Sequence, residues 1–283
     1  MHYHITHETV YHFKKPVFFE PHFLRFKPKN TPFIEIKAFE LVITPGPTGL
    51  SESVDVENNF VHMAWFDGLN DQMKITAKLT IATREYNPYN FIIYPQDYLK
   101  VPFHYSEAER ELLGGSLEAE KPGRDLMDFG ERIIHESNSN TVEFLSELTR
   151  QIHQDFSVEY RETGVPFHPD KTFRVKRGSC RDVAWMQVHL LRQLGLASRF
   201  VSGYFYLEAE KPEPELHAWL EVYIPGAGWI GFDPSHGIVA GNNHIPVASS
   251  VHYENTMSVT GSIRGDASSE LLSNVTIEKI VTS

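Results

Sequence analysis

The single cysteine of the chain stands where a glycine-containing loop turns into a helical pattern. Gly178 and Ser179 precede Cys180, and Gly195 ends the run of apolar residues that predicts the helix: Val183, Val188, Leu190, Leu191 and Leu194. The start of a helix offers backbone N–H groups without intrahelical partners and the positive end of the helix dipole. Both favour a thiolate, so the position indicates a nucleophile, whereas the competing interpretation is a small buried apolar residue.

A predicted β-hairpin carries two further side chains that could complete a thiol site. His217 begins a strand and shares one face with Trp219, while the alternate residues are apolar. Asp233 ends the next strand, after a loop at 225–228. An even loop puts Asp233 on the face opposite His217, and an odd loop or a bulge puts both on one face. Ordinary roles compete here too, since the chain has 15 histidines and Asp233 precedes a turn proline.

The elements that must position these residues fall into an α+β arrangement. Alternating apolar and polar residues at 33–43 and 73–81 predict an all-β domain over 1–105, and 106–123 are expected to form a linker. Helices near 142–156 and 181–194, followed by strands near 198–207, 217–224 and 229–232, predict a core of helices packed on an antiparallel sheet over 124–240. Residues 241–283 are expected to add strands that complete the β structure.

Composition excludes several classes of function. A formal net charge of −11 disfavours nucleic acid and anionic lipid as partners, and one cysteine precludes an internal disulfide. No apolar run approaches the roughly 20 residues that span a bilayer, and the N-terminus lacks the pattern of a signal peptide. We therefore expect a cytoplasmic protein without a membrane partner.

A histidine-based metal site is an alternative that the N-terminal residues raise. The first strand region carries five histidines, of which His2 and His4 share a face by alternation: His2, His4, His7, His12 and His22. Spacing places no third ligand beside them, so a solvated strand is the favoured interpretation. No metal and no cofactor is expected.

Four blocks of the second region, in order, resemble the transglutaminase-like superfamily. They are residues 177–182, 191–204, 217–223 and 228–234, and the segments 11–17, 24–26 and 55–61 are similar to the β domain that precedes the core in the bacterial branch. The resemblance implies a papain-like core with Cys180 as nucleophile, His217 as base and Asp233 as the group that orients the imidazole.

The sequence departs from the usual bacterial pattern beside the nucleophile. Arg181 stands where glutamine is expected and Trp185 where histidine is common, so relatives' substrate specificity does not carry over. Together with Trp219, these residues are candidates for the substrate site. Tyr160 is a candidate for the second oxyanion donor beside the backbone N–H of Cys180, although a structural loop tyrosine is the competing interpretation.

The resulting hypothesis is a cysteine enzyme that acts on peptide or carboxamide bonds of a peptide or protein substrate through a thioester. Water as acceptor gives a peptidase or amidase, which we favour, and an amine gives a transglutaminase. A non-catalytic binding module on the same fold is the rival from another class, and it would be expected to lack a member of the triad.

Overall fold

An 18-residue strand at the start of the chain organises the first half of the molecule. The computed structural model describes residues 1–161, 164–206 and 215–280. Strand β1 (His2–Phe19) buries alternate side chains, among them Tyr3 and Ile5, and has partners on both edges. The sheet runs in the order β15, β1, β6, β3, with β16 also paired to β1: β15 (Ile263–Arg264), β6 (Asn70–Thr83), β3 (Ile34–Thr44) and β16 (Ser269–Ile280).

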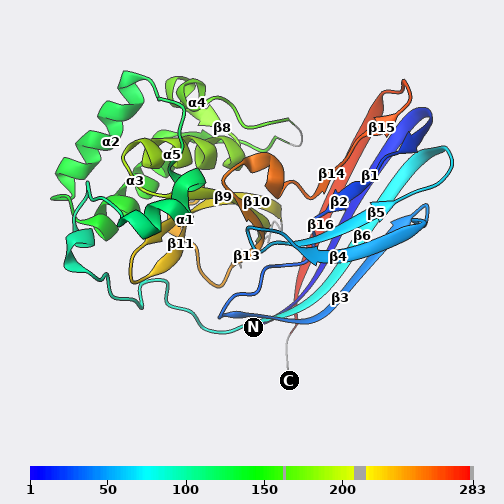
Figure 1. Cartoon of the computed structure of the whole chain (residues 1–283), viewed down its shortest axis with the longest axis horizontal. Helices are drawn as coiled ribbons and strands as arrows, with labels where there is room; N and C mark the ends of the chain where they lie inside the picture. Colours follow the sequence, from blue (N-terminus) through cyan, green and yellow to red (C-terminus); the bar gives the residue numbers. More distant parts are fainter. Residues whose placement is uncertain (162–163, 207–214, 281–283) are drawn as a thin grey trace.

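A second sheet packs on this one and closes a β sandwich. Its order is β14, β2, β5, β4: β14 (Val259–Thr260), β2 (His22–Leu24), β5 (Phe60–Trp65) and β4 (Gly49–Val54). Figure 1 shows the sandwich as one lobe, with strands from both ends of the chain side by side. Its core includes Phe19, Leu24, Ile75 and Ile81.

The other lobe contains both strands and helices, and we call it the mixed lobe. It is built on an antiparallel sheet in the order β12, β11, β10, β9, β13. The strands are β12 (Ile238–Val239), β11 (Gly228–Asp233), β10 (Glu215–Ile224), β9 (Ser198–Phe205) and β13 (His244–Ser250). A short parallel pair, β7 (Ser157–Val158) and β8 (Arg177–Gly178), leads into the helix that begins at Cys180.

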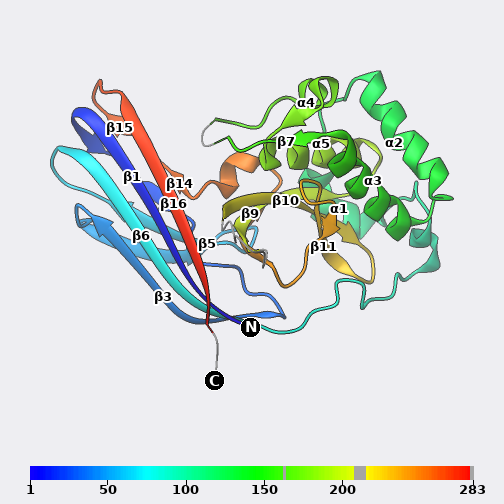
Figure 2. The same cartoon turned by 180° about the vertical axis from the view of Figure 1, so that it is seen from behind.

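The described residues of this lobe form five α-helices. They are α1 (Glu107–Leu117), α2 (Arg124–Glu136), α3 (Thr141–Asp155), α4 (Pro169–Val175) and α5 (Cys180–Gln193), with two 3-10 turns, η1 (Gln96–Leu99) and η2 (Tyr253–Thr256). Helices α1, α3 and α5 contact the sheet, and α2 and α4 pack on other helices. Seen from behind in Figure 2, α2 and α3 lie at the end farthest from the sandwich. None of the described helices is long and apolar enough to cross a bilayer.

The two lobes share apolar contacts. Tyr204 of β9 and Ile245 of β13 belong to the same buried cluster as the inner face of the sandwich. His7 of β1 reaches across to the mixed lobe, where its Nδ1 lies 3.2 Å from the hydroxyl oxygen of Tyr204. The sandwich therefore packs directly against the sheet that carries the candidate site.

The observed packing differs in three places from the domain boundaries expected from the sequence. Ile93, Val101 and Phe103 contribute to the core of the mixed lobe, although 1–105 was expected to be β domain. The expected linker holds helix α1, which runs through its glycine pair and buries Leu113. Strand β13 joins the core sheet, whereas β14, β15 and β16 return to the sandwich. Alternation and turn residues show where a strand begins but not which sheet it joins.

Candidate active site

Hydrogen bonds and a close contact hold the first turn of α5 in place. Ser179 is the N-cap, and its backbone N–H and hydroxyl donate to the Asp182 carboxylate at 2.6 and 2.8 Å. A side chain at Gly178 would meet the Cβ atom of Asp182 at 2.7 Å, so only glycine fits there without a shift. Cys180 thus occupies the first position of a firmly capped helix, as the sequence predicted.

Asp182 also ties a neighbouring loop to this helix start. It is fully buried, and its second oxygen accepts hydrogen bonds from the Arg161 guanidinium and the Phe167 backbone N–H, each at 2.7 Å. The guanidinium of Arg161 stacks over the Phe167 ring and donates to the Val165 carbonyl. One carboxylate therefore holds the start of the Cys180 helix together with Arg161 and Phe167.

The hairpin of β10 and β11 has the odd loop that the triad requires. Ile224 pairs with Gly228 and Leu220 with Phe232, which leaves three residues in the loop. The next residue, Asp233, consequently falls opposite Trp219, on the face of His217. Gly228 has a positive φ of 80°, a conformation that suits glycine in such a turn. The conditional prediction of an odd loop is confirmed.

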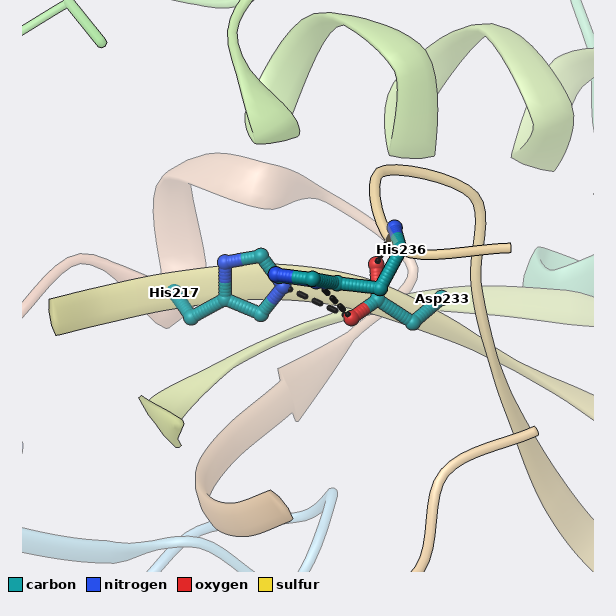
Figure 3. A group of neighbouring side chains, drawn as sticks. All are labelled: His217, Asp233 and His236. Carbon is teal, nitrogen blue, oxygen red and sulfur yellow. Dashed lines mark hydrogen bonds and ion pairs between the residues drawn. The ribbon is translucent and has the colours of Figure 1, made fainter. Parts of the chain in front are cut away.

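His217 and Asp233 form a buried pair. The Nε2 atom of His217 lies 2.9 Å from Oδ2 of Asp233, and the two side chains are 1% and 0% exposed. The other carboxylate oxygen accepts from the backbone N–H and the hydroxyl of Ser235, at 3.0 and 2.5 Å. Figure 3 shows the ring of His217 directed at this carboxylate, with His236 joined to it as well. The pair has the geometry of the base and orienting group of a thiol triad.

Two histidines that sequence reasoning missed complete the surroundings of Asp233. Nδ1 of His236 and Nε2 of His244 lie 2.8 and 3.0 Å from the same oxygen, Oδ2. The Gly241 N–H donates to Nδ1 of His244, so the ring proton of His244 sits on Nε2 and points at Asp233. His236 follows Asp233 by three residues in one turn, which is a local signal. His244 comes from β13, and no local pattern in the sequence indicates that it lies beside Asp233.

The electrostatics keep this carboxylate ionised. Burial alone would raise the pKa of Asp233, but attraction to His217 and hydrogen bonds from the three histidines outweigh it and hold the pKa well below its ordinary value. Burial lowers the pKa of His244, against the raising influence of its bond to Asp233. A neutral His244 is therefore the donor, and the negative charge stays on Asp233.

Cys180 lies on the helix that packs against the strand of His217. The cysteine is partly buried against Ala184, Phe200 and Ala218, and Ala218 directly follows His217 in β10. The structure thus gathers the helix of Cys180 and the His217–Asp233 pair within one lobe.

The other candidate residues occupy different surroundings. Burial lowers the pKa of Arg181, and its interaction with Cys180 opposes that shift, while its guanidinium donates to the Arg161 carbonyl. Trp185 packs with Cys180 against the Phe200 cluster. Tyr160 is 81% exposed. Trp219 is 1% exposed and stacks beside His217 at 6.1 Å between ring centroids, so it supports the imidazole from within the lobe.

The N-terminal histidines do not form a metal cluster. Among the described residues, the one group of three histidine, cysteine or acidic side chains with converging ligand atoms is His217, Asp233 and His236. His7 instead lies buried between Tyr204, Thr9 and Ser273. His7, the buried histidine of β1, therefore packs between the two lobes.

Two family models match the chain in order. Residues 3–82 match the bacterial transglutaminase-like N-terminal region, and residues 128–234 match the transglutaminase-like superfamily. The chain is accordingly a member of the transglutaminase-like superfamily, bacterial type, with an N-terminal β domain. The resemblance seen in the sequence is confirmed, and the α+β fold class with it.

Individual relatives add the fold but no activity. The chain is similar to the crystal structure of a candidate cysteine protease from Cytophaga hutchinsonii, with a TM-score of 0.71 and 20% sequence identity. The alignment covers 100% of this chain and 92% of the Cytophaga hutchinsonii chain. An uncharacterized protein of Mycobacterium tuberculosis is 26% identical over 132 residues, which are 43% of this chain and 42% of the relative. An uncharacterized Bacillus subtilis protein is 37% identical over 76 residues, 23% of this chain and 10% of the relative. The chain thus spans less than half the length of these curated relatives.

Proposed function

We propose that the protein hydrolyses peptide or carboxamide bonds with Cys180 as nucleophile, His217 as general base and Asp233 as the orienting anion. The observation that carries this proposal is the buried His217–Asp233 pair at 2.9 Å. It stands on the strand against which the helix of Cys180 packs, in a transglutaminase-like core. The name of the Cytophaga hutchinsonii protein, a candidate cysteine protease, points to the same class.

In this proposal the two nitrogens of His217 have different roles. Nε2 is engaged with Asp233, so Nδ1 is the nitrogen that takes the thiol proton. The thiolate then attacks the carbonyl carbon, and the oxyanion meets the backbone N–H of Cys180 at the first helical position. Collapse breaks the C–N bond, the imidazolium gives its proton to the departing amine, and a thioester remains.

Hydrolysis closes the cycle. His217 accepts a proton from water, the resulting hydroxide attacks the thioester carbon, and the imidazolium returns the proton to the cysteine sulfur as the acid leaves. A primary amine in place of water would form a new amide. The chemistry up to the thioester is the same for both acceptors, so the acceptor is what an experiment must determine.

The test is turnover of glutamine-containing peptides by the wild type, Cys180→Ala and Asp233→Asn, with and without an added primary amine. We expect ammonia or peptide fragments without amine incorporation, and no turnover in Cys180→Ala. Asp233→Asn should retain activity lowered by about a hundredfold or more, because the charge that stabilises the imidazolium is lost. Incorporation of the amine would assign a transglutaminase.

The binding-module alternative predicts a different set of results. The wild type would be inert towards every amide, and Cys180 would react with iodoacetamide at the same rate in the wild type and in His217→Ala. A thioester adduct on Cys180, detected by mass spectrometry, would exclude that alternative.

A further inference from the structure

The ligand atoms around Asp233 converge as they would on a metal ion. Nε2 of His217, Oδ2 of Asp233 and Nδ1 of His236 all lie within 4.8 Å of one another. Each nitrogen is already within 2.9 Å of Oδ2, so the three possible ligand atoms are gathered around one oxygen. We propose that His217, Asp233 and His236 bind a divalent transition-metal ion of the zinc class, and that this ion reversibly blocks the thiol chemistry.

The donor set matches this class of ion. Two imidazole nitrogens and one carboxylate oxygen, with a fourth position open, suit zinc and its neighbours rather than calcium or magnesium, which take oxygen ligands. The His236 side chain is 31% exposed, whereas those of His217 and Asp233 are buried. An ion from solvent can therefore reach the cluster along His236.

The charge of the site also favours a cation. Every ion-pair partner that the described residues place at the Asp233 carboxylate is a histidine: His217, His236 and His244. Besides the two hydrogen bonds from Ser235, the buried negative charge is therefore compensated by imidazole protons, and no lysine or arginine of the described residues pairs with it. A divalent ion would neutralise the carboxylate without them.

His244 orients the carboxylate rather than binding the ion. Its Nδ1 accepts the Gly241 N–H, so Nε2 must keep its proton and has no lone pair for a metal. That proton is directed at Asp233 Oδ2 at 3.0 Å. Such a hydrogen bond to a metal-binding carboxylate is the arrangement that fixes ligands in metalloproteins.

Occupation of the site would disable His217 by moving a proton within its ring. When Nε2 binds the metal, the neutral imidazole carries its proton on Nδ1, and His236 likewise carries its proton on Nε2. No proton is gained or lost in either ring. Nδ1 of His217 can then no longer accept the thiol proton, so the metal inhibits the reaction. This inhibition rests on the proposed function, whereas the binding itself does not.

Binding is measured on the full-length Cys180→Ala protein, which removes the thiol as a rival ligand. Zinc is titrated by calorimetry, and cobalt(II) is added as a probe whose visible absorption reports its coordination. We expect one ion per chain, and an affinity lowered about tenfold or more in Cys180→Ala/His236→Ala. The matched control is Cys180→Ala/His135→Ala, which removes an exposed helical histidine and should bind as Cys180→Ala does.

Three outcomes overturn the proposal: no saturable binding, equal affinity in the His236 variant and its control, or binding by the wild type that disappears in Cys180→Ala. Thermal unfolding of each variant establishes that it is folded, and His236→Gln replaces His236→Ala if the latter is not. Inhibition is a separate measurement on the wild type, where chelator should restore activity. If the chelated wild type is inert, the proposed function fails while the binding result stands.

Discussion

A single carboxylate oxygen, Oδ2 of Asp233, lies within hydrogen-bonding distance of three imidazoles. Only one of them, His217, belongs to the proposed triad. The other two hold the carboxylate where His217 needs it, and His244 does so with a proton whose place is fixed by the Gly241 N–H. We regard His244 as a positioning residue because it contacts Asp233 rather than a substrate.

Replacing His244 by alanine should lower kcat about tenfold and leave KM nearly unchanged. The reason is the loss of one hydrogen bond to a charged group, which contributes roughly 1.5 kcal/mol or more. His244→Gln, whose amide N–H can donate, should recover part of the rate. Steady-state kinetics of the purified variants provide the measurement.

The control for that prediction is His62→Ala, which removes a histidine of similar burial from β5 of the sandwich. Its kcat should match the wild type. If His244→Ala also keeps the wild-type kcat, or if both variants lose activity equally, the positioning role is wrong.

At the scale of elements, the site depends on how α5 begins. Asp182 receives two hydrogen bonds from Ser179 and two from the loop that carries Arg161 and Phe167. Its negative charge also lies in the first turn of α5, where the helix dipole favours it. The N-cap of the helix that starts at Cys180 is thus joined to Arg161 and Phe167 through one buried side chain.

Asp182→Asn should destabilise the fold by roughly 2 to 4 kcal/mol, because a buried charge-assisted network loses its anion and Arg161 loses its partner. The midpoint of denaturant unfolding should fall accordingly, and the loop near residue 165 should become more sensitive to limited proteolysis. Asp128→Asn is the control, because its pair with Arg124 is solvent-exposed and worth at most about 1 kcal/mol. Equal midpoints for the two variants would contradict this account.

The sequence predicted the elements at the site better than their partners in space. The helix that starts at Cys180 and the hairpin with Asp233 follow from capping residues and alternation, which act locally. Strand β13 was expected to complete the β structure, yet it pairs with β9 at the edge of the core sheet. That pairing brings His244 to Asp233, and it joins residues far apart in the chain, so no local pattern could indicate it.

At the scale of the whole molecule, the sandwich and the mixed lobe meet at a titratable contact. Burial lowers the pKa of His7 from 6.5 to about 4, so the folded protein holds this imidazole neutral between Tyr204 and Ser273. Between pH 6.5 and 4 the unfolded chain binds a proton here and the folded chain does not. The contribution of the neutral His7 to the free energy of unfolding is therefore fully present above pH 6.5, and it is lost progressively as the pH is lowered towards 4.

The predicted loss from His7 is roughly 3 kcal/mol across that range. His7→Gln should flatten the decline in unfolding free energy between pH 6.5 and 4, measured by denaturant unfolding at several pH values. The pH dependence of the unfolding free energy that remains in His7→Gln includes a contribution from His189, because burial also lowers the pKa of His189 to about 4. The exposed His4 of the same strand supplies the control, and His4→Gln should leave the profile unchanged. A profile that His7→Gln does not alter would refute the assignment.

The pairing of β1 with β16 has a consequence for the order in which the molecule is made. During translation, β1 emerges from the ribosome before its partners β6 and β16, which follow roughly 70 and 270 residues later. Until β16 emerges, one edge of β1 has its backbone donors and acceptors unpaired, which is the condition under which strands associate with other chains. The mixed lobe is synthesised in that interval and contains its own core. We infer that the lobe with Cys180 can form its own core during translation, whereas the sheet of the sandwich is completed only when β16 has been synthesised.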